Sequence, residues 1–233
     1  MSNKIEAETG VLYVVALSIG NEADLSPRAK EALSAAEIIL AEDTRRAGIL
    51  MSNLGLKKRL VSYYDQNETS RVDEAIRNLK SGSAVALVSD AGTPCISDPG
   101  YRIVKACHEN QIRVRPIPGA SAVVTALSVS GLPTDRFVYE GFLPPKGAKR
   151  TRRIQDILDR EMTSVVYEST HKIQKLIDEM AILSPDRLIF IAREMTKTYE
   201  EFLRGTTQEL ATIISERKGL KGEMVVVISG NKQ

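Results

Sequence analysis

Short apolar runs recur along the first half of the chain, separated by segments with helical spacing. The runs at residues 11–17, 38–41, 60–62, 84–88 and 114–117 predict strands, and the segments between them predict helices. Strands that alternate with helices in this way form a mostly parallel sheet covered on both faces, with right-handed crossovers. Ligands of such sheets bind beyond the carboxyl ends of the strands, so the residues at those ends are the first candidates for a site.

Local signals set the expected ends of the helices. Ser26 precedes Pro27, which combines an N-cap with a proline at the first helical position. Gly55 and Gly82 are expected to end two helices, and Ser70 is expected to cap the helix that lies between them.

The pattern changes in the second half, where helices separate the strands less regularly. Strands are expected at residues 137–140, 164–168, 188–193, 200–204 and 223–229, and Thr206 and Glu209 have the spacing of a capping box. Two of these strands follow each other without a helix, which predicts a mixed sheet. The sequence therefore predicts two α/β domains, residues 1–117 and 118–233, with a cleft between them as the expected binding site.

The composition is that of an ordinary folded protein, with 42% hydrophobic and 27% charged residues. The 32 basic and 30 acidic residues give a net charge of +2, so any attraction to nucleic acid must be local. Cys95, Cys107 and two histidines are too few for a zinc site, and no metal is expected. The longest apolar stretch is far shorter than the ~20 residues of a membrane span, so we expect a cytoplasmic protein with reduced thiols.

Charged and small residues follow two of the expected strands. Glu42, Asp43 and Arg45 follow the second strand, where a parallel sheet binds ligands, although the same side chains could cap the next helix. Residues 89–100 follow the fourth strand and are rich in Asp, Ser, Thr, Gly and Pro, which is typical of a rigid ligand-binding loop. The alternative for this segment is that Asp98 only caps the helix that follows.

Other segments carry weaker signals. Residues 17–21 end the first strand with small residues but lack the G-x-G-x-x-G pattern of dinucleotide-binding proteins. Residues 118–122 open a helix whose free amides could meet a polar edge of a cofactor. Residues 146–153 hold five basic residues and no acid, which indicates phosphate contact or a solvated helix start. His171 could be a base or a surface residue.

Several of these segments, taken in order, resemble the tetrapyrrole methylase superfamily and, within it, the small-subunit 16S rRNA (cytidine-2′-O)-methyltransferase family. The resemblance runs from about Leu12 to Gly230. Its motifs are Ile19-Gly20-Asn21, Ala41-Glu42-Asp43-Thr44-Arg45, residues 89–100, Pro116-Ile117-Pro118-Gly119, residues 130–137, Glu140-Gly141-Phe142-Leu143-Pro144, Tyr167-Glu168-Ser169, residues 192–197 and Lys221-Gly222-Glu223. The departures from the family pattern are Leu17-Ser18 where Thr-Pro is usual, Ala120 where Pro is usual, and Thr170-His171-Lys172 where Pro-His-Arg is usual.

The resemblance implies two α/β domains of the tetrapyrrole methylase type, a homodimer, and S-adenosylmethionine bound in the cleft. It implies cofactor contacts at Ile19, Asp90, Thr93, Ser121, Ala122, Tyr167, Ala192 and Glu223. The activity of the family is methyl transfer to the ribose 2′-hydroxyl of a cytidine in the decoding region of small-subunit rRNA. The implied partner is therefore the small ribosomal subunit or its 16S rRNA.

For this chemistry, Glu42 or Asp43 is expected to accept or orient the hydroxyl proton, while Arg45 and Lys197 hold neighbouring phosphates. The RNA backbone is expected to contact the basic run, at Lys146, Lys149, Arg150, Arg152 and Arg153. Two alternatives stay open, because a fold does not determine a function. One is a tetrapyrrole C-methyltransferase, and the other is an RNA-binding module without catalytic activity.

Overall fold

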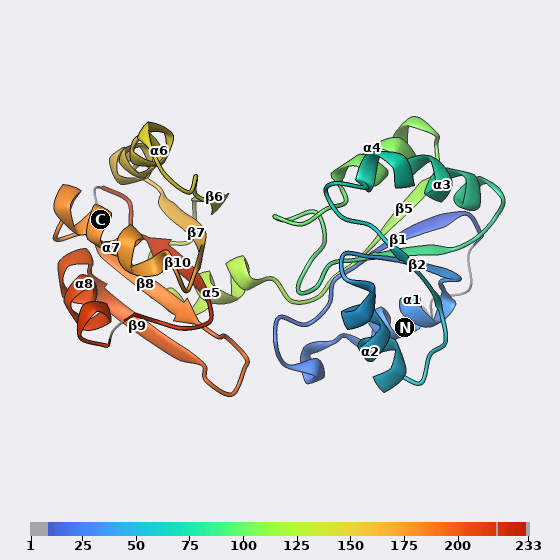
Figure 1. Cartoon of the computed structure of the whole chain (residues 1–233), viewed down its shortest axis with the longest axis horizontal. Helices are drawn as coiled ribbons and strands as arrows, with labels where there is room; N and C mark the ends of the chain where they lie inside the picture. The colour runs from blue at the N-terminus through green and yellow to red at the C-terminus, as the bar shows by residue number, and fades with distance from the viewer. Residues whose placement is uncertain (1–8, 218, 232–233) are drawn as a thin grey trace. The chain divides into compact units, whose positions relative to one another are not determined.

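The computed structural model describes residues 9–217 and 219–231. The chain divides into two compact units, Met1–Ser121 and Ala122–Gln233, and each is built around one sheet (Figure 1). Within the described residues, no helix is both long enough and apolar enough to cross a membrane.

The first unit is a five-stranded sheet with the order β3-β2-β4-β1-β5, and every described strand pair is parallel. The strands are β1 (Val11–Val15), β2 (Ile38–Ala41), β3 (Arg59–Ser62), β4 (Val85–Val88) and β5 (Arg113–Ile117). The helices are α1 (Pro27–Ala35), α2 (Thr44–Asn53), α3 (Glu68–Lys80) and α4 (Tyr101–Glu109), with a short 3-10 turn η1 (Glu22–Asp24). The strands predicted for this half of the chain are confirmed.

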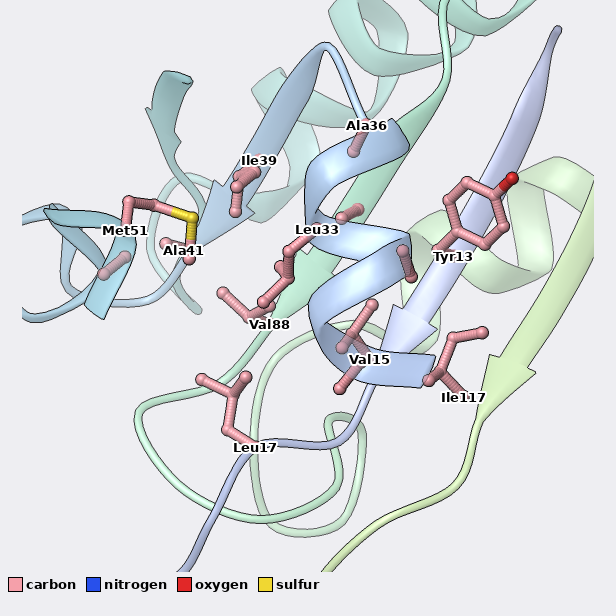
Figure 2. Close-up of a cluster of buried hydrophobic side chains, with 14 of the residues drawn as sticks. Tyr13, Val15, Leu17, Leu33, Ala36, Ile39, Ala41, Met51, Val88 and Ile117 are labelled. Carbon is pink, nitrogen blue, oxygen red and sulfur yellow. The ribbon is translucent and has the colours of Figure 1, made fainter. Parts of the chain in front are cut away.

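The central strands of this sheet are apolar along their whole length because helices cover both faces (Figure 1). Alternate side chains of each strand point to opposite faces, so β2 contributes Ile39 to one buried cluster and Leu40 to the other. The first cluster packs against Leu33 of α1 and Met51 of α2 (Figure 2). The second packs against α3 and α4, and includes the buried Leu79.

Most of the predicted helix ends are confirmed. Ser26 caps α1 by accepting a hydrogen bond from the amide of Ala29, and Gly55 and Gly82 follow helix ends with positive φ. The prediction for Ser70 is wrong, since α3 begins two residues earlier, at Glu68. Its hydroxyl bonds back to the carbonyl of Asn67, and the helix starts where the buried Glu68 side chain is held by tertiary contacts.

The second unit has the strand order β6-β7-β10-β8-β9, and its sheet is mixed as predicted. Its strands are β6 (Phe137–Phe142), β7 (Thr163–Ser169), β8 (Leu188–Arg193), β9 (Glu201–Thr206) and β10 (Glu223–Ile228). Its helices are α5 (Ala122–Ser130), α6 (Ala148–Asp159), α7 (Ile173–Leu183) and α8 (Thr207–Glu216). Strand β6 runs parallel to β7, whereas β10 is antiparallel to both β7 and β8. The predicted capping box of Thr206 and Glu209 is present at α8.

Candidate functional site

Three loops meet at the carboxyl edge of the parallel sheet in the first unit. The amide of Leu17, after β1, donates to the carbonyl of Gly92 over 2.8 Å, and the amide of Gly92 donates to the carbonyl of Ser18 over 3.2 Å. The hydroxyl of Thr93 donates to the carbonyl of Ala120, after β5, over 3.1 Å. These bonds join the loops that follow β1, β4 and β5, which carry the predicted cofactor contacts Ile19, Asp90, Thr93 and Ser121.

Glycine at position 92 is favoured by the backbone conformation at this meeting of loops. Its φ is +69°, and a Cβ there would lie 3.3 Å from Cγ2 of Ile19 and 3.6 Å from the carbonyl oxygen of Ala120. A residue with a side chain would therefore strain the backbone at this left-handed φ and would also press on the side chain of Ile19.

Asp90 also binds the loop that follows β2. Its Oδ1 accepts a hydrogen bond from the amide of Asp43 over 3.1 Å, and its Oδ2 lies 3.1 Å from Nη1 of Arg46. The predicted catalytic residues and a predicted cofactor contact thus share one edge of the sheet.

Asp43 caps α2, which is the alternative that the sequence left open. Its Oδ1 accepts a hydrogen bond from the amide of Arg45 over 2.8 Å, and its Oδ2 pairs with Nη2 of Arg45 at 2.9 Å. These bonds with Arg45 lower the pKa of the Asp43 carboxyl to about 2. Asp43 is therefore a poor proton acceptor at neutral pH.

Glu42 has the opposite electrostatic environment. Burial raises the pKa of its carboxyl, and the negative charge of Asp90 raises it further. Asp98 is shifted more strongly: burial, followed by the charges of Glu42 and Asp90, raises its pKa to about 7. Asp98 was not among the predicted catalytic residues, although its place in the loop after β4 was a usable signal.

A buried carboxylate anchors the far end of that loop. Glu68 Oε1 accepts hydrogen bonds from the hydroxyl of Tyr63 over 2.9 Å and from the amide of Gly100 over 3.0 Å. Its Oε2 pairs with Nε of Arg102 at 3.2 Å. Asp98 lies two residues before Gly100. Glu68 therefore restrains the backbone next to the carboxyl whose pKa is raised.

The other predicted cofactor contacts belong to the second unit. Tyr167 on β7 and Ala192 on β8 both pair with Val225 of β10, so they lie in one row across the sheet. Glu223 begins β10 at the same edge, opposite Ser169. Ala122 is the first residue of α5.

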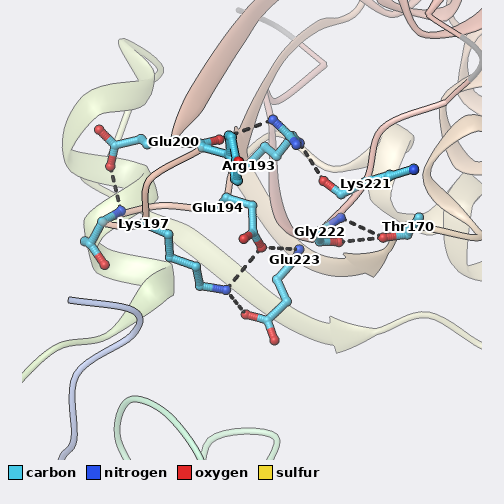
Figure 3. A network of polar contacts seen from close by, with 10 residues as sticks. Thr170, Arg193, Glu194, Lys197, Glu200, Lys221, Gly222 and Glu223 are labelled. Carbon is cyan, nitrogen blue, oxygen red and sulfur yellow. Dashed lines mark hydrogen bonds and ion pairs between the residues drawn. The ribbon is translucent and has the colours of Figure 1, made fainter. Parts of the chain in front are cut away.

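Lys197 is held at this edge by two carboxylates (Figure 3). Its Nζ lies 2.7 Å from Oε2 of Glu223 and 3.1 Å from Oε1 of Glu194. Glu194 Oε1 also accepts a hydrogen bond from the amide of Glu223 over 2.8 Å, which closes the network. Burial by itself would lower the pKa of Lys197, but these two hydrogen bonds outweigh it and the pKa is raised.

The basic run divides into exposed and buried residues. Lys146, Lys149, Arg152 and Arg153 are exposed, and Nε of Arg153 pairs with Glu140 at 2.9 Å. The prediction that Arg150 contacts RNA is wrong, because its side chain is buried within the second unit.

Arg150 is an internal anchor of the second unit. Its Nε donates to Oε2 of Glu179 over 2.7 Å, its Nη1 donates to the carbonyl of Pro144 over 3.2 Å, and Glu168 lies 3.6 Å away. The sequence contained a signal for this burial. Arg150 precedes the buried Ile154 and Ile157 at the spacing of one helix face.

Comparison with known proteins agrees with this architecture. Residues 11–211 match the family model of tetrapyrrole (corrin/porphyrin) methylases. Ribosomal RNA small subunit methyltransferase I of Haemophilus influenzae is 45% identical over 224 residues, which cover 95% of this chain and 79% of that protein. The protein of the same name from Synechocystis sp. is also 45% identical, over 222 residues with the same coverage.

Two solved structures share the fold. Uroporphyrin-III-C-methyltransferase from Thermus thermophilus is similar with a TM-score of 0.68 at 21% identity, covering 94% of each chain. A cobalt precorrin-4 methyltransferase has the same TM-score at 14% identity, also with 94% of each chain covered. At these identities the likeness shows the fold alone, whereas the closer sequence relatives identify the family. The chain therefore belongs to the tetrapyrrole (corrin/porphyrin) methylase family and, within it, to the group named ribosomal RNA small subunit methyltransferase I.

Proposed function

We propose that this protein transfers a methyl group from S-adenosylmethionine to the ribose 2′-hydroxyl of a cytidine in the decoding region of small-subunit rRNA. The observation that carries the proposal is the 45% identity to ribosomal RNA small subunit methyltransferase I over 95% of the chain. Membership of this group supports rRNA methylation. The cytidine and its 2′-oxygen are the finer part and come from the family resemblance, whereas the motif Glu42 to Arg45 and the exposed basic run favour RNA over a tetrapyrrole as the substrate.

The residues at the edge of the first sheet fit a cationic methyl donor. Glu42, Asp90 and Asp98 concentrate carboxylates there, and carboxylates attract a sulfonium and an ammonium group. When bound, S-adenosylmethionine supplies an electrophilic methyl group. Asp90 and the backbone of the loops that carry Ile19, Thr93 and Ser121 are proposed to contact the donor. The other proposed contacts are Ala122, Tyr167, Ala192 and Glu223.

Glu42 is the best candidate for the group that accepts the hydroxyl proton. A ribose hydroxyl is a weak acid, and a carboxylate with a raised pKa is a stronger base than an ordinary one. Asp98, with a pKa of about 7, is the second candidate. Asp43 instead orients Arg45, whose exposed guanidinium is available to a phosphate of the RNA.

The remaining contacts with RNA are proposed for exposed basic side chains. Lys146, Lys149, Arg152 and Arg153 on and before α6 would neutralise backbone phosphates, which positions an RNA without reading its sequence. Lys197 can contribute only through its spare donor capacity, because two carboxylates already hold it.

The test is methyl transfer from radiolabelled S-adenosylmethionine to small ribosomal subunits that lack the modification, followed by nuclease digestion and identification of the labelled nucleoside. We expect the label in 2′-O-methylcytidine. Label in another nucleoside would refute the cytidine assignment. Absence of label from subunits and naked rRNA, with label in a porphyrinogen substrate, would favour tetrapyrrole methylation. RNA binding without any transfer would indicate the non-catalytic module.

A homodimer and a cytoplasmic location complete the proposal. The homodimer comes from the family resemblance, whereas the location comes from the expected reduced thiols and is supported by the rRNA substrate. Light scattering on the purified protein measures the mass in solution, and a monomeric mass would exclude the homodimer.

A further inference from the structure

A β-bulge redirects the end of strand β6. The pairing of β6 with β7 shifts register between Tyr139 and Gly141, where Gly141 has a φ of +67°. Without the bulge, Tyr139 and Phe142 would point to opposite faces of the sheet, since three positions separate them. With it, both rings contact Tyr167, the residue of β7 that pairs with Phe142.

The bulge also sends Glu140 to other partners. Its carboxylate pairs with Arg153 at 2.9 Å and with Arg160 at 2.5 Å. Two ion pairs therefore hold Glu140, whereas the side chain of Phe142 is exposed to solvent.

The Phe142 ring is supported but largely uncovered. Its centroid lies 5.6 Å from that of Tyr167 at an interplanar angle of 67°, and the residue is 61% exposed. In this edge-to-face arrangement, Tyr167 covers only part of the Phe142 ring. The rest of the ring surface is exposed to water. An exposed phenyl ring that rests on another ring in this way can take a second flat ring against its free surface.

Basic residues near Phe142 in the sequence indicate that the second ring belongs to a polyanion. Lys146 follows four positions later, so its Cα lies no more than about 14 Å away along the chain. Lys149 is exposed at the start of α6, and among the described residues neither lysine has an ion-pair partner. The buried Arg150 holds the connecting turn by donating to the carbonyl of Pro144, which keeps the aromatic and basic groups on one segment.

We propose that Phe142 is a stacking platform for an unpaired base of the substrate RNA, with Lys146 and Lys149 binding the adjacent phosphates. Unpaired bases stack on exposed aromatic side chains, and basic residues beside the ring hold the backbone of the same strand. The inference rests on the proposed function for its choice of RNA as the ligand. The adenine ring of the cofactor has the same chemistry, so the experiment has to separate the two sources.

The chain contains no tryptophan, so Phe142→Trp introduces a unique fluorescent reporter at the platform. The probe is a single-stranded RNA oligonucleotide that contains cytidine, and S-adenosylhomocysteine is titrated separately. Phe137→Trp is the matched control, because Phe137 is a 42% exposed aromatic residue at the other end of the same strand. We expect RNA to quench the fluorescence of the Phe142→Trp variant strongly and that of the Phe137→Trp control little, and S-adenosylhomocysteine to quench neither.

Binding measurements make the inference quantitative. Phe142→Leu is expected to weaken RNA binding about tenfold, a usual consequence of losing one base stack, and to leave S-adenosylhomocysteine affinity unchanged. Phe137→Leu should bind both as the unaltered protein does. RNA binding by Phe142→Leu at unaltered affinity would overturn the inference, as would quenching by S-adenosylhomocysteine alone. Failure of the proposed function is a separate result, namely no methyl transfer by the unaltered protein to unmodified subunits.

Discussion

The backbone amide of Asp43 donates a hydrogen bond to Oδ1 of Asp90 over 3.1 Å, although 47 positions separate the two residues in the sequence. The bond joins the loop after β2 to the loop after β4 and brings Glu42 close enough to Asp90 for their charges to interact. One edge of the sheet thus combines a carboxyl with a raised pKa, another with a lowered pKa, and an exposed arginine.

Replacing Glu42 tests its role as the proton acceptor. Glu42→Gln should lower the rate of methyl transfer by about 10²- to 10⁴-fold, the usual contribution of a positioned base, with little change in S-adenosylhomocysteine affinity. Asp43→Asn is the matched control, since asparagine caps a helix as well as aspartate does. It should cost far less activity. Equal losses in the two variants would assign the proton to neither residue.

The pH dependence of stability tests the environment of Asp98. Its pKa in the folded protein is about 7, above the ordinary value of 3.8, so between these two values the folded state binds more protons than the unfolded state. Its contribution to stability is therefore fully present below about pH 4 and is lost as the pH rises through 7. The raised pKa of Glu42 acts in the same direction.

Asp98→Asn removes the destabilisation that the ionised Asp98 carboxylate causes above pH 7. We expect its Tm to exceed that of the unaltered protein by about 2–4 °C at pH 8, the change that ~1 kcal/mol produces in a protein of this size, and to match it at pH 4. Asp73→Asn, at an exposed position of α3, is the control and should change the Tm at neither pH. A Tm difference for Asp98→Asn that is the same at both pH values would contradict the assignment.

Glu68 is expected to be a stability determinant of the first unit. Glu68→Ala leaves the hydroxyl of Tyr63 and the amide of Gly100 without their acceptor, which should cost about 1–3 kcal/mol in the free energy of unfolding. Glu74→Ala, on the same helix, removes only partly exposed ion pairs and should cost less than about 1 kcal/mol. Urea unfolding measures both values, and hydrogen exchange should show faster exchange of the Gly100 amide only in Glu68→Ala.

Arg150 and Lys149 are expected to separate stability from RNA binding. Arg150→Ala leaves the buried Glu168 without its nearest cation and should cost about 3–5 kcal/mol in the free energy of unfolding. Lys149→Ala should leave the unfolding free energy unchanged, weaken RNA binding and reduce the slope of log K against log salt by about 0.7 to 0.9. A stable Arg150→Ala variant that loses only RNA affinity would restore Arg150 as an RNA contact.

The strands, and the helix ends at Ser26 and Thr206, were predictable because they depend on side chains a few positions apart. Whether each sheet is parallel or mixed was equally predictable. Parallel neighbours need a crossover such as a helix between them, whereas two strands that follow each other directly pair antiparallel. The location of the candidate site could also be predicted in large part, because the sequence shows where the strands end. The burial of Arg150 was predictable too, from its position on the apolar face of α6.

Tertiary structure alone decided how carboxyl groups at the same edge differ. Glu42, Asp43 and Asp98 are all carboxyls of one edge, yet only Asp43 has a lowered pKa, because Arg45 bonds to it while burial and like charges act on the other two. The bulge at Gly141 that exposes Phe142 beside Tyr167 also follows from strand pairing. Periodicity and capping act over a single turn or strand, so the sequence by itself determined the elements and the edge at which chemistry lies. Burial, charge environment and register depend on groups brought together from distant positions, and only the folded chain determined them.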